Sequence, residues 1–294
     1  MLPSRYFWEL TQPEIAAQLK NNPLVILPAG SVEQHGPHLP AGTDIYAANV
    51  ISHAVAERMD ALVLPGGPLG VTPMHMPFEA TITLTPDTYM KVVVETGVAT
   101  AGHGAKRFLI LNWHEGNIPS LAIAAESLHR DHGLSVLTVQ ACYVAADLYG
   151  KDSGGLTHGG EIEALAVLAH RPDLVHLDRI DYSSDHSHGR KWDKLRRTRS
   201  YQPVLTDIRT IAPTGWYGSP EHATVEKGKR MIAAAMSASS SACSTRLRAA
   251  PPRSSISRWL RRWRACSRRA KQRTSASPGA NRSRSSRGRR ARAR

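Results

Sequence analysis

The sequence has only three cysteines among its 294 residues, and no two of them have Cys-x-x-Cys spacing. A disulfide framework and a thiolate zinc site both need more numerous and more closely spaced cysteines, so neither is expected. No apolar run approaches the roughly 20 residues of a membrane-spanning helix, and the N-terminus lacks the pattern of a signal peptide. We therefore expect a cytoplasmic protein with no membrane contact.

Acidic residues are absent from the C-terminal part of the chain. Residues 241–294 hold 18 of the 38 Lys and Arg residues and no Asp or Glu, so the first 240 residues carry 20 basic and 24 acidic side chains. The formal net charge of +14 thus belongs to the tail. Residues 1–235 are predicted to form one slightly acidic domain, long enough for a substantial core. Residues 236–294, rich in Arg, Ser and Ala, are predicted to be disordered because they have little aliphatic surface to bury.

Two explanations of this tail stay open. A basic arm that binds nucleic acid would show strongly salt-dependent binding. The tail has a single lysine and only Trp259 and Trp263 as aromatic residues, so nucleic acid is not the favoured partner. The abrupt change of composition instead favours translation of the tail in a shifted reading frame.

Short apolar runs alternate with helical segments along the first 170 residues. The runs predict buried strands at 24–27, 61–64, 107–111 and 134–139. An alternation of Thr with apolar residues predicts one further strand, at 80–84. The segments that follow the strands predict helices at 43–59, 85–102, 119–132 and 159–169. One more helix is predicted near the end of the domain, at 221–232. This order predicts an α/β fold, a three-layer sandwich with a mainly parallel sheet and helices on both faces. Residues 181–222 are expected to be loops that cover a site or contact another subunit.

A Gly- and Pro-rich turn after the first strand carries three side chains that could bind a metal. Glu33 and His35 are two residues apart and point to the same side of an extended segment. Asp44 lies at the start of the next helix. Carboxylates and imidazoles are the ligands of hydrolytic zinc, manganese or iron sites. A polar loop with a helix-capping residue would have the same pattern, so this segment alone leaves both interpretations open.

Two later segments place more polar side chains in comparable positions. His114 follows the strand 107–111, and ligands of α/β folds gather at the carboxyl ends of parallel strands. His158, Glu161 and Glu163 follow further on, with glycines beside His158 that let the backbone approach a substrate closely. This agreement favours a binding site. A dinucleotide site is not favoured, since no Gly-x-Gly-x-x-Gly follows the first strand.

The segments 30–44, 112–117 and 158–163 together resemble the motifs of the creatininase (creatinine amidohydrolase) family, over roughly residues 20–235. The resemblance implies a two-metal amidohydrolase of α/β architecture with a small-molecule substrate. It also implies a homo-oligomer, often a hexamer. By motif, Glu33, Asp44 and His114 would hold one divalent ion (Zn, Mn or Fe). His35 and Asp44 would hold a second ion, with Asp44 bridging the two.

The resemblance leaves one ligand of the second ion open. Creatininase itself has a carboxylate at the position of Gly116, and Glu115 is one residue away from it. Glu163 is the expected replacement, with Glu161 next; either could take a proton from water if it is not a ligand. His158 matches a histidine that acts on the substrate or its leaving group. Creatinine itself is therefore not the favoured substrate.

Several alternatives follow from these departures. Cyclic amides and formamides are the favoured substrates, and lactone-like rings, peptides or a catalytically silent metal-binding homologue are the alternatives. Gln34 and His38 are expected to orient the metal ligands. His75 and the histidines outside the three motifs are expected to be structural or exposed.

Overall fold

The structure is a computed structural model that describes residues 2–67, 69–150, 155–183, 186–197 and 204–247. Its strands are β1 (Leu24–Ala29), β2 (Leu62–Val63), β3 (Arg107–Asn112) and β4 (Ser135–Gln140). Its α-helices are α1 (Gln12–Asn21), α2 (Thr43–Met59), α3 (Pro86–Gly102), α4 (Ile118–His132), α5 (Ala141–Tyr149), α6 (Glu161–Leu168), α7 (Ser187–Arg196) and α8 (Val225–Arg246). In these residues, no helix combines the length and apolarity needed to cross a membrane.

The four strands form one sheet in the order β2-β1-β3-β4, and every neighbouring pair is parallel. In the central pair, Leu24 lies opposite Arg107 and Ala29 lies opposite Asn112. Strands β1 and β3 therefore end at the same edge of the sheet. The loops that follow them, which carry two of the three sequence motifs, begin side by side.

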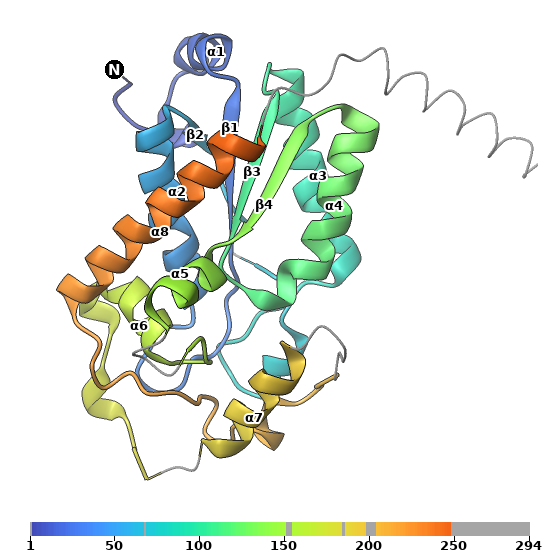
Figure 1. Cartoon of the computed structure of the whole chain (residues 1–294). Coiled ribbons are helices and arrows are strands. Elements are labelled where there is room, and N and C mark those ends of the chain that lie inside the picture. Colours follow the sequence, from blue (N-terminus) through green and yellow to red (C-terminus); the bar gives the residue numbers. More distant parts are fainter. Residues whose placement is uncertain (1, 68, 151–154, 184–185, 198–203, 248–294) are drawn as a thin grey trace, which may run out of the picture. The chain divides into compact units, whose positions relative to one another are not determined.

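Alternate residues of the central strands pack on opposite faces of the sheet. Leu109 and Leu111 belong to a core shared with α2, α5, α6 and α8. Phe108 and Ile110 belong to a second core shared with α3 and α4. Figure 1 shows the same layers, with α3 and α4 on one side of the sheet and α2 and α8 on the other. The predicted three-layer α/β sandwich is confirmed.

The last helix is longer than predicted. Helix α8 runs from Val225 to Arg246, so the predicted end at 232 is wrong, and the boundary placed at 235 falls inside the helix. Ala235, Ser239 and Cys243 are almost fully buried and are spaced by four residues, which puts them on one helical face. Small residues let α8 pack against α2 and α6 without an obvious hydrophobic stripe, and this hid the helix in the sequence. Residues 248–294 lie outside the described residues, so their disorder stays a prediction.

Other differences concern polar or short segments. The predicted strand at 80–84 makes only isolated bridges, from Ile82 to Val32 and from Thr83 to Gly70. Helix α7 forms inside the region that was expected to be loops. Because its composition is strongly polar, this segment lacks the apolar period that predicts a helix. Ion pairs from Asp193 to two arginines stabilise the last turn of the helix.

Candidate metal centre

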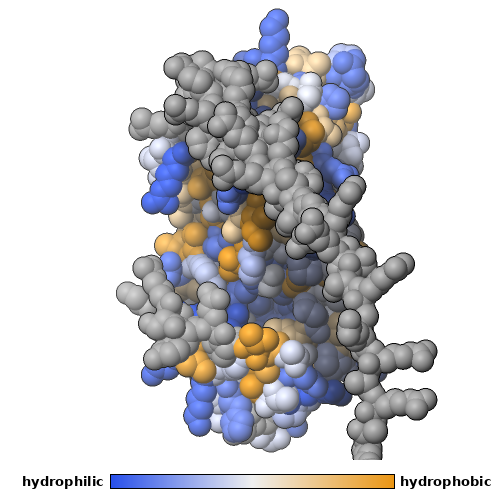
Figure 2. Space-filling view, turned by 90° about the vertical axis from the view of Figure 1, so that its right-hand side faces the viewer, coloured by the Kyte–Doolittle hydropathy of each residue, from blue (hydrophilic) through white to orange (hydrophobic). Residues whose placement is uncertain are grey.

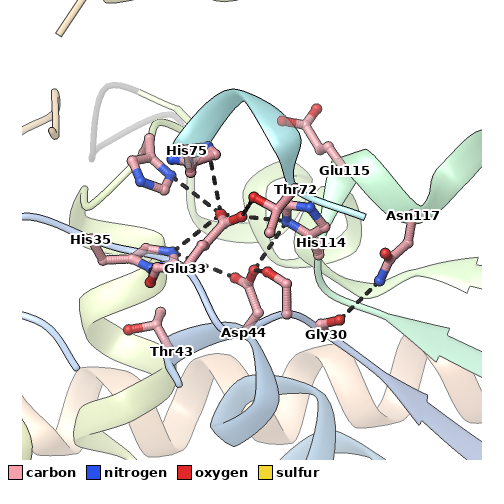
Figure 3. Close-up of polar contacts among 12 residues, drawn as sticks. Gly30, Glu33, His35, Thr43, Asp44, Thr72, His75, His114, Glu115 and Asn117 are labelled. Carbon is pink, nitrogen blue, oxygen red and sulfur yellow. Dashed lines mark hydrogen bonds and ion pairs between the residues drawn. The ribbon is translucent and has the colours of Figure 1, made fainter. Parts of the chain in front are cut away.

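The carboxyl edge of the sheet gathers five side chains from four parts of the chain. Glu33 and His35 come from the loop after β1, and His114 comes from the loop after β3. Asp44 and Glu163 lie in the first turns of α2 and α6, where the helix dipole favours a negative charge. Figure 3 shows Glu33, His35, Asp44 and His114 pointing toward one another.

Glu33, Asp44 and His114 form a first donor set. Nδ1 of His114 lies 3.4 Å from Oε1 of Glu33 and 3.1 Å from Oδ2 of Asp44. The other ring nitrogen, Nε2, lies 3.1 Å from the carbonyl oxygen of Val71, to which it can only donate. This bond leaves the lone pair of Nδ1 directed at the two carboxylates, which is the arrangement that metal-binding histidines use.

His35, Asp44 and Glu163 form a second donor set. Nε2 of His35 lies 3.6 Å from Oδ1 of Asp44 and 3.5 Å from Oε2 of Glu163. Nδ1 of the same ring donates to the carbonyl oxygen of Glu33 at 3.0 Å. Nε2 is buried and has no hydrogen-bond partner among the described residues. Its lone pair therefore points into the carboxylates, as that of His114 does.

The two donor sets share Asp44, whose two oxygens face different histidines. Within each set the donor atoms lie within 4.8 Å of one another, and a third such set combines Glu33, His35 and His158. Glu33 and Asp44 are only 2% and 1% exposed. In the described part of the chain, their ion pairs, and those of Glu163, involve histidines alone. Buried carboxylates with converging imidazole lone pairs fit divalent cations well.

The pKa values of the histidines and glutamates at the site show that the buried carboxylates favour a positive charge beside them. Burial alone would lower the pKa of His35 and His114, but the neighbouring carboxylates outweigh it and raise both pKa values well above the usual range. Burial would raise the pKa of Glu33, yet His114 and His75 hold it well below the usual range. The pKa of Glu163 is raised, mainly by burial. A divalent ion would supply this positive charge and displace the protons.

Glu161 and Glu115 lie apart from the donor sets. The carboxylate of Glu161 forms an ion pair with Lys227 of α8, because its position at the start of α6 turns it toward that helix. Glu161, expected as a possible ligand or proton acceptor, thus belongs to none of the donor sets in the described residues. Glu115 accepts hydrogen bonds from Arg196, Arg197 and Tyr143 instead of facing the donor sets.

Gly116 occupies the position, two residues after His114, at which creatininase has a carboxylate. The structure leaves little room for a side chain at this position. A Cβ atom on Gly116 would lie 2.3 Å from the carbonyl oxygen of Val71 and 2.5 Å from Nε2 of His114. These are the two atoms whose hydrogen bond orients the His114 ring. A side chain here would displace the His114 ring or the Val71 carbonyl, whereas Glu163 already lies in the second donor set.

The structure adds three residues that the sequence analysis did not assign to the site. Oγ of Ser31 donates to Oδ2 of Asp44 at 2.7 Å, and Oγ1 of Thr72 donates to Oε2 of Glu33. His75, expected to be structural or exposed, is buried, with Nε2 3.8 Å from Oε1 of Glu33. His75 ends a short 3-10 helix (Pro73–His75) and Thr72 precedes it, in a segment without a motif, so only tertiary structure could place them.

His158 and His75 form one wall of the site. Their rings lie 4.3 Å apart, and the ring of His158 lies 4.3 Å from that of His35. Burial, together with His75 and His35, keeps the pKa of His158 well below the usual range. Burial lowers the pKa of His75 to about 4.

The donor sets open into a pocket of about 410 Å³. Its polar end contains Glu33, Asp44, His114, His158 and Glu163. Further lining residues come from α7 and the segment after it: Trp192, Arg196, Leu205, Ile208 and Tyr217. The expectation that 181–222 covers a site agrees with this placement.

Comparisons with known proteins agree on one family, that of the creatininases. The model of the family described as "Creatininase: Creatinine amidohydrolase" matches residues 8–243. The mycofactocin precursor peptide peptidase of Mycobacterium ulcerans is 30% identical over 223 residues, which cover 72% of this chain and 80% of that protein. The creatinine amidohydrolase of Pseudomonas putida is 32% identical over 200 residues, which cover 61% and 77%.

Solved structures agree in fold. A structure described as "Creatininase Mn" superposes with a TM-score of 0.68 at 26% identity, covering 83% of this chain and 99% of that one. A creatininase variant described as "Zn-Zn type" has a TM-score of 0.67 at 26% identity, covering 84% and 99%.

Proposed function

The chain belongs to the creatininase family and is a hydrolase of carbon–nitrogen bonds, and on this premise we propose that it is a binuclear metal-dependent amidohydrolase. The observation that supports two ions is the pair of donor sets that share Asp44. Glu33, Asp44 and His114 would hold one ion, and His35, Asp44 and Glu163 the other. Relatives described with manganese and with zinc support a divalent cation; iron is the third candidate.

Two such ions, when bound, supply a water of lowered pKa and polarise a carbonyl group. The protein's own residues do the rest. Ser31 and Thr72 fix the carboxylates of Asp44 and Glu33 by donating hydrogen bonds. Glu163 accepts a hydrogen bond from the backbone N–H of Gly159 at 2.6 Å, which orients it toward His35.

His158 is the residue that we propose to move the proton. Its Nδ1 lies 3.8 Å from Oε1 of Glu33 and borders the pocket. As attack on the carbonyl carbon proceeds, Nδ1 accepts a proton from the water and returns it to the leaving nitrogen as the C–N bond breaks. Glu163 is a ligand in this scheme, so no carboxylate is needed as the base.

The proposed substrate is a small molecule with a cyclic amide, a formamide or a related carbonyl C–N bond. A peptide is a second candidate, because the mycofactocin precursor peptide peptidase of Mycobacterium ulcerans is 30% identical to this chain. The pocket of about 410 Å³ lies within the usual range for drug-sized ligands, and its apolar lining residues, such as Trp192, Leu205 and Ile208, would contact apolar parts of either substrate. A lactone-like ring is a further alternative within the family.

We also propose that the chain forms a homo-oligomer. The resemblance to the creatininase family implies that this oligomer is a hexamer. Val92, Val98 and Ile123 of α3 and α4 are between 37% and 59% exposed. Figure 2 shows the side on which these helices lie in Figure 1, with orange patches among blue ones. Light scattering on the purified protein tests the state: a monomer at all concentrations would contradict this proposal.

Metal analysis of the full chain tests the proposed chemistry. We expect about two divalent ions per chain, and loss of metal in Glu33→Gln and His114→Asn. Glu126→Gln, whose pair with Arg130 lies at the surface, is the matched control and should keep both ions. A panel of cyclic amides, formamides, lactones and short peptides, followed by product release, then identifies the substrate class. A wild-type chain that binds no zinc, manganese or iron would overturn the proposal.

A further inference from the structure

The side chain of Gln34 lies between the two histidines that border the pocket. Its Nε2 is 3.0 Å from Nδ1 of His75 and 3.2 Å from Nε2 of His158. All three residues are buried, with exposures of 8%, 4% and 9%. The donor and acceptor roles in this cluster follow from its backbone partners.

Two backbone groups fix the orientation of the Gln34 amide. The N–H of Gly36 lies 3.1 Å from Oε1, and an N–H can only donate. The carbonyl oxygen of Gly215 lies 2.6 Å from Nε2, and a carbonyl can only accept. Nε2 is therefore the NH2 group, and one of its two hydrogens is used by Gly215.

The backbone also fixes the proton of His158. Nε2 of His158 lies 2.7 Å from the carbonyl oxygen of Gln34, so it must donate and must carry the hydrogen. A protonated Nε2 cannot accept from the Gln34 amide. Nδ1, which lies 3.8 Å from Oε1 of Glu33, keeps its lone pair and presents an acceptor to the site.

The second hydrogen of the Gln34 amide then goes to His75. Nδ1 of His75 accepts it, so the proton of this ring is on Nε2. Nε2 lies 3.8 Å from Oε1 of Glu33, on the pocket side. His75 therefore presents a donor where His158 presents an acceptor, although both rings carry their proton on Nε2.

The fold reserves space for this amide. Gly215 has a φ of +87°, and a Cβ atom there would lie 2.2 Å from Oε1 of Gln34. A side chain at 215 would be strained in this left-handed conformation and would also push the amide away from both histidines.

We propose that Gln34 is a positioning residue whose side-chain amide sets the tautomer of His75 and whose main-chain carbonyl sets that of His158, so that an N–H donor and a bare nitrogen face the substrate side by side. The inference rests on the proposed function for its chemistry. The N–H of His75 donates to the carbonyl oxygen as negative charge develops there and transfers no proton. Nδ1 of His158 takes the proton of the attacking water and delivers it to the leaving nitrogen, so the reaction balances. The wrong tautomer of either ring would place two donors or two acceptors against each other.

The tautomers can be read directly by NMR. The full chain is labelled with ¹⁵N-histidine, and the ring nitrogens are correlated with ring protons in the metal-free and the zinc-loaded protein. His75→Phe and His158→Phe assign the signals by deletion. We expect both rings to show a protonated Nε2 and a bare Nδ1. A protonated Nδ1 on either neutral ring would overturn the inference.

Gln34→Glu is the informative variant because a carboxylate cannot donate to His75. It should move the His75 proton to Nδ1, leave His158 unchanged, and lower kcat about 10- to 100-fold with less than about a threefold change in KM. Gln18→Glu is the matched control, since Gln18 also donates to a backbone carbonyl, that of Asp60, but lies outside the site. An unchanged His75 signal in Gln34→Glu would also overturn the inference.

Two further variants separate positioning from folding. Gly215→Ala should shift the His75 signals, as Gln34→Glu does, while the fold persists in circular dichroism. His75→Gln keeps a donor and should recover part of the kcat that His75→Phe loses. The NMR measurement needs no substrate, so a chain with the expected tautomers but no amidohydrolase activity would refute the proposed function and leave the tautomer assignment standing.

Discussion

Glu161 and Glu163 offer a sharp test, because two glutamates in one helical turn have different partners. Glu161 forms an ion pair with Lys227, whereas Glu163 lies 3.5 Å from Nε2 of His35. Glu161→Gln should therefore cost stability and leave the metal centre intact. Glu163→Gln should cost one metal ion and leave stability nearly unchanged.

The expected magnitude follows from burial. The side chains of Glu161 and Lys227 are 2% and 23% exposed. Removing one partner of a fully buried pair costs roughly 3–5 kcal/mol. The partial exposure of Lys227 and the remaining amide oxygen of glutamine reduce this, so we expect about 2 kcal/mol, or roughly 4–8 °C in Tm. The ion-pair partner of Glu163 is His35, which Asp44 continues to face, so Glu163→Gln should shift the Tm of the metal-free protein by less than Glu161→Gln does.

Thermal unfolding in a chelator and metal analysis after reloading measure the two effects separately. Glu163→Gln should retain about one of two ions, and Glu161→Gln should retain both. The reasoning is refuted if Glu161→Gln loses an ion at full occupancy of the wild type, or if Glu163→Gln still binds two.

Three further predictions concern the surroundings of the site and the end of the domain. Gly116→Glu restores the carboxylate position of creatininase but should reduce metal binding at least tenfold, because its Cβ displaces the His114 ring; metal titration checks this, and tighter binding would contradict it. Glu115→Gln weakens the ion pairs with Arg196 and Arg197 and should speed proteolysis within 187–217 while Tm changes little. Glu126→Gln is the exposed control. Equal cleavage of both variants would count against a role of Glu115 in holding α7 in place. Truncation after residue 250 should leave Tm unchanged, whereas truncation after 235 removes the buried Cys243 and Leu247 and should cost on the order of 4 kcal/mol; equal Tm values for the two would show that the end of α8 contributes nothing.

The origin of the tail needs a separate measurement. Sequencing the coding DNA around and beyond codon 235 tests a shift of reading frame. An unshifted frame throughout would contradict the frameshift hypothesis.

The sheet and most of its helices were predictable because their signals are local. The apolar runs at 24–27 and 107–111 and the helix at 43–59 need only neighbouring residues to be recognised. Helices α1, α5 and α7 were not predicted, and α8 was cut short because its burial depends on partners far along the chain. Ala235 and Ser239 have meaning only against α2 and α6.

The amino-acid sequence by itself determined the fold class, the family resemblance and the side chains Glu33, His35, Asp44 and His114, since all four lie in motifs at the ends of predicted elements. Only the tertiary structure gives Glu161 and Glu163 different partners, because side chains two residues apart on a helix point in different directions, one toward Lys227 and the other toward His35. It alone brought Thr72 and His75 to Glu33. Such contacts join loops that are distant in sequence, and no local pattern encodes the distance between them.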